Sequence, residues 1–398
     1  MPRAFLLLSV LCSIAADAPP AFLVHSAAGK PLKGSLKQID DKWNVIIGDA
    51  RARVDGVELI SLRRADMPLP APPASPQAIF ANGDRLPGTA GTLTGARLTF
   101  VPASGGAEIA LPVPALSVLW FDHPADAARP ERVRQRLLAE RRTKDLVWLK
   151  NGDQLQGNLL RLDGQTVVIE VDRTETKVDR AKVAVIALNN ELPRSLKPAG
   201  NYGLLLLANG GRLGVATAQT DGTTLTAKTL FGETLKLPLD QLVALDIFQG
   251  KAIYLSDLKP KAYQYVPFLD AKEPPFSWSA DTSVAGDDLR LGQSTFVKGL
   301  GMHSESRLTY ALDGGYRRFE AMVGVDPAAD PRAEVRIKIL VDGKPRAWGW
   351  DKELTARTGP KEVLVDVTGA RELTLTVEHG PLPFVGGRVN WADARLVK

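Results

Sequence analysis

Hydrophobic and polar residues alternate in short runs between residues 22 and 249, and turn residues separate one run from the next. The segment Val167–Val171 (VVIEV) is typical of these runs. A period of two predicts β-strands, because successive side chains of a strand point to opposite faces. Three runs lead into Asn-Gly, at Asn82, Asn151 and Asn209, which favours a type I′ hairpin turn with positive φ at both residues. We therefore predict short antiparallel strands joined by tight turns.

This pattern of apolar residues and turns occurs four times. A leucine lies four positions after each turn asparagine, or after Ala28 in the first copy, at Leu32, Leu86, Leu155 and Leu213. Each copy ends with two apolar residues five positions apart, Val54/Leu59, Leu111/Leu116, Val178/Val183 and Leu237/Leu242. The four repeats occupy residues 22–65, 79–122, 146–192 and 203–249. They resemble tandem SH3-like or Sm-like small β-barrels of exported proteins, although a continuous solenoid would satisfy the same spacing.

Two segments interrupt the repeats. Residues 66–78 contain five prolines and predict an extended linker. Residues 123–145 predict a basic connecting helix with Pro130 in its first turn. Between Arg129 and Lys144 there are seven basic residues and two glutamates, an excess that equals the formal net charge of +5 of the whole chain. The helix would bind an anionic surface or simply pack its apolar stripe and leave its charges solvated. Because the rest of the chain is charge-balanced, we expect no nucleic-acid partner.

The first 18 residues predict a secretory signal peptide. A cationic start, a short apolar run and small residues follow one another in the order typical of such peptides. The sole cysteine, Cys12, lies in this segment, so the sequence excludes an intramolecular disulfide and a cysteine-based metal site. No later run of about 18 apolar residues predicts a transmembrane segment. We therefore expect an exported protein that is periplasmic, bound to the cell surface or secreted.

The composition changes from residue 250 onward. Residues 250–398 hold 14 of the 25 aromatic residues, and two motifs stand out: Lys-Gly-Leu-Gly-Met-His at 298–303 and Trp-Ala-Asp-Ala-Arg-Leu at 391–396. In their order and spacing, these motifs and the strands between them resemble the NPCBM family, the novel putative carbohydrate-binding module, over 254–398. The resemblance implies a galactose-binding-like jelly roll, a non-catalytic role, recognition of galactose-type sugars and a structural calcium ion. The predicted fold is therefore all-β, with tandem small β-barrel repeats followed by a galactose-binding-like jelly-roll β-sandwich at 250–398.

Six residues of this region are candidates for contact with a glycan. Aromatic rings pack well against the apolar face of a pyranose, and polar side chains bind its hydroxyl groups. The candidates are Trp278, His303, Trp348, Trp350, Arg388 and Asn390. Each also has a structural interpretation: the indoles as core residues, His303 bonded to the backbone, and Arg388 and Asn390 as ordinary loop residues. Trp391 is expected in the core.

The candidate calcium ligands are Asp257, Asp281 and Asp393. Before the final tryptophan the family has an Asp-His-x-Asp pattern, whereas this chain has Gly-Arg-Val-Asn at 387–390, which removes two carboxylates. The departure weakens the expectation of calcium.

Three functions are compatible with this sequence. The preferred one is an exported, non-catalytic carbohydrate-binding protein in which the repeats present the C-terminal module to a glycan or polysaccharide. The second is a scaffold whose repeats bind other proteins of the cell envelope. The third is a glycoside hydrolase or its accessory subunit, in which Glu320 and Asp326 would form the carboxylate pair.

Overall fold

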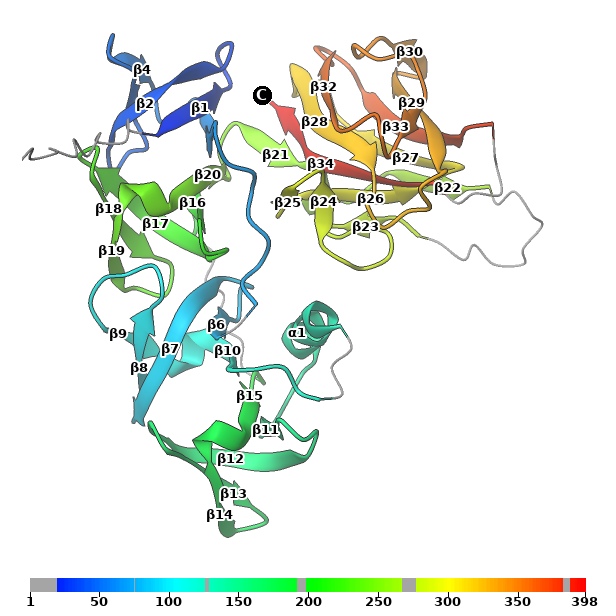
Figure 1. The fold of residues 1–398 in the computed structure, drawn as a ribbon. Helices are drawn as coiled ribbons and strands as arrows, with labels where there is room; N and C mark the ends of the chain where they lie inside the picture. The colour runs from blue at the N-terminus through cyan, green and yellow to red at the C-terminus, as the bar shows by residue number, and fades with distance from the viewer. Residues whose placement is uncertain (1–19, 75, 126–128, 192–197, 267–276, 382–386) are drawn as a thin grey trace, which may run out of the picture.

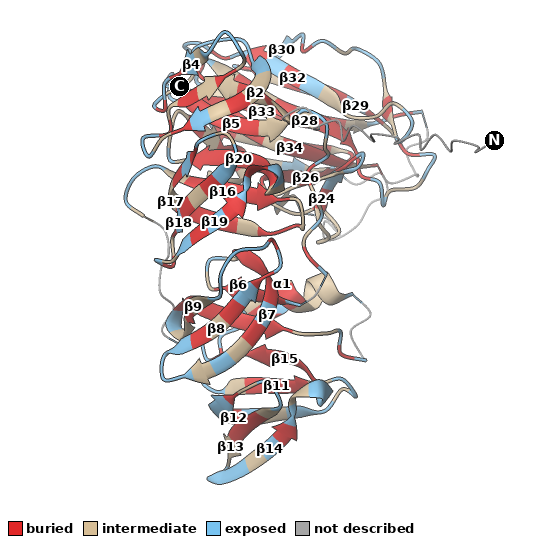
Figure 2. Cartoon of the chain, turned by 60° about the vertical axis from the view of Figure 1, so that its left-hand side comes forward, coloured by how far each residue is buried: buried red, intermediate tan, exposed pale blue. Residues whose placement is uncertain are grey.

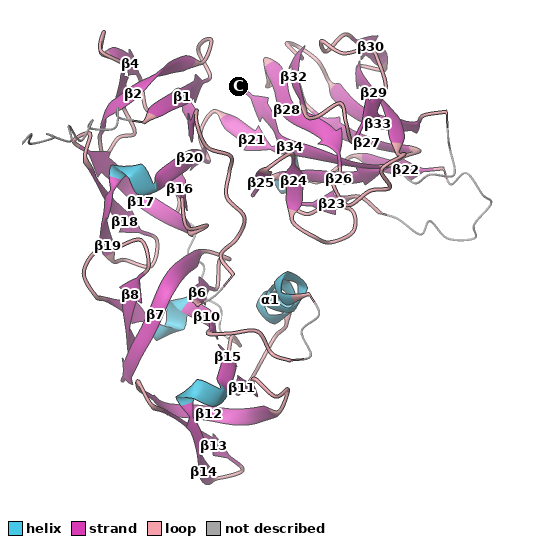
Figure 3. Cartoon of the chain, in the orientation of Figure 1, coloured by secondary structure: helices cyan, strands magenta, loops and turns pink. Residues whose placement is uncertain are grey.

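The computed structural model describes residues 20–398 except 75, 126–128, 192–197, 267–276 and 382–386. The predicted signal peptide, with Cys12, lies outside the described residues. Almost all regular elements of the described chain are strands, so the predicted all-β class is confirmed (Figure 3). Its one α-helix, α1 (Pro130–Ala139), lies within the basic segment, and no helix in the described ranges is long and apolar enough to cross a membrane.

Each of the four repeats consists of five antiparallel strands in the lateral order fifth, first, second, third, fourth. The first repeat contains β1 (Ala21–Ser26), β2 (Leu32–Ile39), β3 (Val45–Ile47), β4 (Ala52–Val54) and β5 (Leu59–Arg64). The second contains β6 (Gln77–Phe80), β7 (Arg85–Thr94), β8 (Arg97–Pro102), β9 (Ile109–Pro112) and β10 (Leu116–Trp120). The third contains β11 (Asp145–Leu149), β12 (Gln154–Leu162), β13 (Thr166–Val171), β14 (Thr174–Asp179) and β15 (Val183–Ala187). The fourth contains β16 (Tyr202–Leu207), β17 (Arg212–Thr220), β18 (Thr224–Thr229), β19 (Thr234–Pro238) and β20 (Leu242–Phe248). In repeats two to four a single 3₁₀ turn precedes the fifth strand, at Val113–Ala115, Arg180–Lys182 and Leu239–Gln241.

The Asn-Gly hairpins have a different turn from the one predicted. In the second repeat Gly83 has φ +88°, whereas Asn82 is not among the residues with positive φ. The N–H of Gly83 donates to the carbonyl of Phe80, and the Asn82 side chain accepts from the N–H of Asp84 at 3.1 Å. These bonds describe a three-residue loop with a type I turn and a glycine in the left-handed region, rather than a type I′ turn. The same bonds recur at Asn151 and Asn209.

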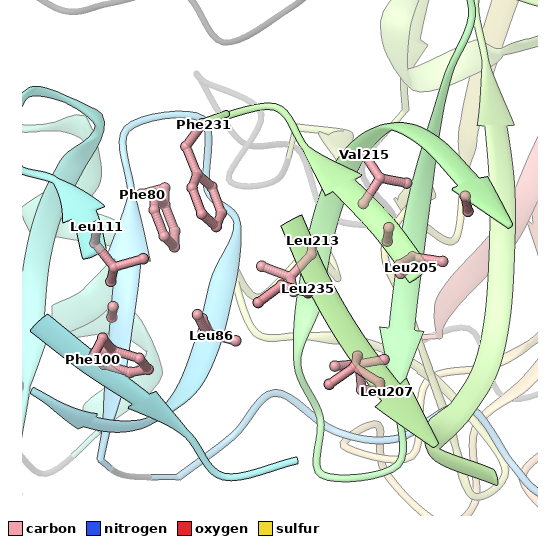
Figure 4. Close-up of a cluster of buried hydrophobic side chains, with 14 of the residues drawn as sticks. Phe80, Leu86, Phe100, Leu111, Leu205, Leu207, Leu213, Val215, Phe231 and Leu235 are labelled. Carbon is pink, nitrogen blue, oxygen red and sulfur yellow. The ribbon is translucent and has the colours of Figure 1, made fainter. Parts of the chain in front are cut away.

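The repeats associate in pairs through their fifth strands. Strand β5 pairs with β20, and β10 pairs with β15, so the order along the column is first, fourth, second, third (Figure 1). The two pairs meet where the second and fourth repeats touch (Figure 4). There the rings of Phe80 and Phe231 stack, with centroids 4.3 Å apart. This order differs from that of a solenoid, in which consecutive repeats are neighbours.

Three of the fifth strands, β10, β15 and β20, are buried on both faces, which explains why they are almost wholly apolar (Figure 2), whereas β5 also carries Ser61, Arg63 and Arg64. One face of each strand meets the core of its own repeat, and the other face needs a separate cover. Over β10 and β15 this cover is α1, whose buried Leu137 packs with Trp120 and Trp148. Over β5 and β20 the cover comes from the linker residue Leu69 and from the C-terminal domain.

The basic charges of the α1 segment are largely used inside the protein. Arg134 lies 4.4 Å from the ring centroid of Trp120, and Arg136 lies 5.9 Å from that of Trp148. Arg142 is buried and donates to backbone carbonyls, while Arg132 forms an ion pair with Asp287 of the C-terminal domain at 3.0 Å. These contacts favour the packed connecting helix over an anion-binding arm.

The C-terminal domain is a sandwich of two sheets, as predicted. The first sheet has the order β23-β26-β34-β28-β32, with β21 beside β34, and the second has the order β22-β27-β33-β29-β30, with β31 beside β29. The strands of the first sheet are β21 (Ala252–Tyr254), β23 (Ser279–Ala280), β26 (Gly299–His303), β28 (Arg318–Val325), β32 (Lys361–Asp366) and β34 (Arg388–Val397). Those of the second are β22 (Ala262–Tyr265), β27 (Ser306–Ala311), β29 (Glu334–Val341), β30 (Lys344–Arg346), β31 (Leu354–Thr355) and β33 (Glu372–His379). A separate hairpin is formed by β24 (Leu289–Leu291) and β25 (Ser294–Phe296), and a 3₁₀ turn by Leu255–Asp257.

Strand β34 changes the face that it buries at Asp393. This residue has φ +49°, and the pairing of β34 with β28 shifts register there. Before the shift Trp391 points into the core of the sandwich, as expected, and after it Leu396 does so. After the shift Arg395 and Val397 face the repeats, whereas Ala392 before the shift packs against Leu289 and Leu291 of the hairpin β24–β25.

Buried ion pairs hold the sandwich against the first and fourth repeats. Arg63 of β5 lies 2.6 Å from Asp246 of β20 and 3.2 Å from Asp393 of the sandwich. Arg318 of the sandwich donates to the carbonyls of Ser26 and Ala27 at 2.8 and 2.9 Å. The C-terminal domain is therefore packed into the repeat column rather than tethered to it.

Candidate functional site

One end of the sandwich brings together two of the predicted binding residues. His303 ends β26 and pairs directly with Arg388, which begins the neighbouring strand β34. Asp326 follows β28 on the other side of β34, and its N–H donates to the carbonyl of Arg388 at 2.9 Å. Because β26, β34 and β28 are adjacent, the three residues lie at the same end of these neighbouring strands. We call His303, Arg388 and Asp326 the end cluster.

The end cluster combines three different hydrogen-bonding groups. His303 is buried, and its Nδ1 lies 3.3 Å from the carbonyl oxygen of Ser304. Burial lowers the pKa of His303, while the bond to Ser304 acts in the opposite direction, so the imidazole is neutral at neutral pH. Arg388 is half-buried. The guanidinium can donate hydrogen bonds to hydroxyl groups. The neutral imidazole can both donate to hydroxyl groups and accept from them.

Asp326 is the member of the end cluster that sequence reasoning considered only as a catalytic residue. Its Oδ1 accepts from the N–H of Ala328 at 2.9 Å, and its Oδ2 is shielded from solvent without a hydrogen bond in the described part of the chain. Burial raises the pKa of Asp326, and the nearby Arg388 opposes the rise. Asp326 follows a strand that borders β34, and this position in the sequence was the signal that could have assigned it to the end cluster.

The three tryptophans do not form the predicted stacking platform. Trp348 packs within the hydrophobic core of the sandwich, so its ring contacts core side chains rather than a ligand. Gly349 between the two indoles has φ +94° and lies outside any strand, so Trp348 and Trp350 do not share one face of a strand. Trp350 is half-buried under the ammonium group of Lys361, 4.1 Å from its ring centroid, and Trp278 is half-buried against the core.

The sequence prediction that Asn390 contacts a glycan is also wrong. The residue is fully buried, and its Nδ2 donates to the carbonyl of Arg290 at 2.9 Å. Because Arg290 belongs to the hairpin β24–β25, Asn390 fastens that hairpin to the outer face of β34. It is therefore a structural residue rather than a sugar ligand.

The predicted calcium ligands do not form a cation site. Asp257 and Asp281 both bind the ammonium group of Lys298, at 2.7 and 2.6 Å, and Asp393 binds Arg63. Calcium requires six or more oxygen ligands gathered around one point. The described part of the chain contains no group of three or more acidic, histidine or cysteine side chains that could hold a metal ion. The prediction of calcium at these residues is wrong, because protein cations already neutralise the carboxylates.

The carboxylate pair of the hydrolase alternative is also separated by the fold. Glu320 and Asp326 lie at opposite ends of β28, and six residues of strand span about 20 Å. Glycosidase pairs lie about 5–10 Å apart. Glu320 is engaged by Arg395 at 2.9 Å and by Arg318, and these cations keep its pKa low despite its burial.

The sequence of this domain matches a known family. Residues 251–397 match the NPCBM/NEW2 domain. The NPCBM domain thus comprises β21 to β34 and includes the end cluster, which confirms the family prediction for this part of the chain. No curated protein matches the chain.

Solved carbohydrate-binding modules of Clostridium perfringens are similar to the chain. One is CBM51-2 with INT domains of ZmpB in complex with GlcNAc, at 27% identity and a TM-score of 0.33, covering 44% of this chain and 36% of that one. Another is CBM51 of GH95 in complex with methyl-galactose, at 26% identity and a TM-score of 0.31, covering 37% of this chain and 99% of that one. The chain thus spans about a third of the first structure's length.

Proposed function

We propose that this protein is an exported, non-catalytic carbohydrate-binding protein that recognises galactose-type glycans through the end cluster of its NPCBM domain. The family match of residues 251–397 is the observation that carries the proposal. The end cluster supports it, because His303, Arg388 and Asp326 are polar groups of different kinds at one edge of the sandwich.

The packing of the sandwich supports a presenting role for the repeats. Arg63 and Arg318 fix the NPCBM domain to the first and fourth repeats through buried contacts. The end cluster lies at the ends of β26 and β28, whereas Arg318 begins β28 and contacts the repeats. The end cluster therefore lies at the opposite end of β28 from the contacts that Arg318 makes with the first repeat.

A glycan array probed with the full chain tests the sugar class. Binding to glycans that end in galactose, and none to those that end in mannose or glucose, is the expected result. A single monosaccharide site with a millimolar Kd corresponds to about −4 kcal/mol, so the array should use a multivalent form of the protein. Absence of binding to every galactose-containing glycan would refute the proposal.

A further inference from the structure

A second cavity lies between the repeats and the NPCBM domain, away from the end cluster. It has a volume of about 680 Å³ and takes its walls from three parts of the chain: the first turn of the second repeat, the fourth repeat, and the β21 and β26 regions of the sandwich. Asn82, Arg212 and Lys298 mark these three walls. The sequence predicted calcium at Asp257 and Asp281 of this wall but no ligand that also contacts the repeats, because the walls meet only through the pairing order of the repeats.

Arg212 is the charged group of this cavity that lacks hydrogen-bond partners in the described residues, although the charges of Asp288 and Glu131 act on it from nearby. Its Nε and Nη2 are shielded from solvent and have no hydrogen-bond partner in the described part of the chain. Its strand partner across β17 and β7 is Arg85, which Glu131 already neutralises with a two-pronged ion pair. Burial and the charge of Arg85 lower the pKa of Arg212 to about 10, so its guanidinium stays charged at neutral pH. A shielded guanidinium without an acceptor is costly unless an anion completes it.

The other charged groups of the cavity wall all have partners. Lys298 lies between Asp257 and Asp281, which are partly exposed. Asp84 accepts from the N–H of Gly214 at 2.7 Å. The carboxylates of Asp257 and Asp281 keep free lone pairs, which suit the hydroxyl groups of a ligand rather than its acidic group.

Aromatic rings form the remaining part of the wall. The rings of Tyr202 and Phe248 stack with centroids 5.2 Å apart, and Phe248 continues to Tyr254 at 5.4 Å. Tyr202 and Phe248 are only half-buried, and the hydroxyl of Tyr254 is shielded from solvent without a hydrogen bond to any residue that the structure describes. Such a wall, with a neighbouring guanidinium and hydroxyl acceptors, matches a ligand that has one apolar face, several hydroxyls and one negative charge.

We propose that this cavity binds one residue of an acidic saccharide, with the sugar carboxylate at Arg212 and the apolar face of the sugar ring at Tyr202. The inference does not depend on the end cluster, since the two sites share no residue. It gives the repeats a direct part in glycan recognition.

Two probes that differ only at C6 test the proposal: methyl galactopyranosiduronate, which carries a carboxylate, and methyl galactopyranoside, which carries a hydroxymethyl group. Ligand-observed NMR titrations use the full chain with Arg388→Met, so that the end cluster cannot contribute. We expect the uronate to bind at least ten times more tightly than the neutral sugar. We also expect Arg212→Met to weaken uronate binding at least tenfold and Arg161→Met, an exposed arginine of the third repeat, to leave it unchanged.

The same titrations can overturn the inference. Uronate binding that is absent, or unchanged in Arg212→Met, would contradict it. Sodium acetate binding as tightly as the uronate would reduce the site to a general anion site and would contradict the saccharide assignment. If Arg212→Met does not fold, as judged by near-ultraviolet circular dichroism, Tyr202→Leu replaces it, and equal uronate affinity in that variant would reject the proposal.

Discussion

The two repeat pairs solve one structural problem in different ways. In both, two fifth strands pair and create a sheet whose outer face needs a cover, β10 with β15 and β5 with β20. The second and third repeats cover that face with α1, which the chain supplies from the connection between them. The first and fourth repeats cover it with the NPCBM domain and a linker residue. The sandwich thus occupies the structural position that a ten-residue helix fills in the other pair.

The chemistry of the two covers differs as well. Beneath α1 the contacts combine apolar side chains and arginines over the tryptophan rings with an ion pair between Glu131 of α1 and Arg85 of β7. Beneath the sandwich, buried ion pairs join Arg63 to Asp246 and Asp393. Charges that are buried in pairs define one docking geometry, because a shift of either partner leaves a charge unpaired. The sandwich interface therefore depends on a charge pair at a buried aspartate, Asp246, whereas α1 adds one ion pair, Glu131–Arg85, to its contacts over the tryptophan rings.

Of the variants considered, loss of Arg63 is expected to lower the stability of the protein most. Arg63→Met leaves the fully buried Asp246 without its counter-ion, which should lower the free energy of unfolding by about 4 kcal/mol. Urea unfolding with circular dichroism measures the change. The double variant Arg63→Met, Asp246→Leu should recover most of the loss, and the exposed Arg53→Met should change little. A loss below about 1 kcal/mol in the single variant would contradict the role of the ion pairs.

Truncation of the helix cover should have the next largest effect. Leu137 is 1% exposed beneath α1, so Leu137→Ala should cost about 3 kcal/mol through the cavity it leaves. Hydrogen exchange should locate the destabilisation in the second and third repeats. The half-buried neighbour Leu138→Ala serves as the matched control with a smaller loss. Equal destabilisation of the first and fourth repeats would show that the two pairs do not behave as separate units.

A pH dependence confined to the sandwich interface is the smallest effect expected. Burial, with Arg395 and Arg63, lowers the pKa of His25 from 6.5 to about 4. Between these values the unfolded chain binds the proton and the folded chain does not, so His25 makes stability fall as pH decreases from about 6.5 toward 4. His25→Gln should therefore lose less stability than the wild type between pH 7 and pH 5 in urea titrations. An identical loss in both proteins would refute this assignment.

Local sequence patterns predicted where the strands lie better than they predicted which strands of different repeats pair with each other. The alternation at Val167–Val171 and the asparagine-glycine turns located the hairpins, although the bond from Asn82 to the N–H of Asp84 selected a different turn type. The wholly apolar β15 was a sign of burial on both faces. Nothing local in the sequence distinguished β20 from β10 as the partner of β5, because pairing between distant repeats depends on complementary surfaces.

The candidate site was predicted in part for the same reason. His303 ends one strand and Arg388 begins the neighbouring strand, so the fold brings these two residues together. Asn390 was mistaken for a ligand because the hairpin that covers it is distant in sequence. The calcium prediction failed because Lys298 reaches Asp257 and Asp281 across the domain. Arg212 carried no motif at all and became a candidate only through the cavity around it.

The most direct test of the central claim is a titration of the full chain with methyl galactopyranoside, comparing the wild type with Arg388→Met. Arg346→Met, an exposed arginine on β30 of the same domain, is the matched control. The end-cluster assignment predicts that Arg388→Met weakens binding at least tenfold while Arg346→Met binds as the wild type does. Equal affinities in all three proteins, or no binding by the wild type at millimolar sugar, would contradict it.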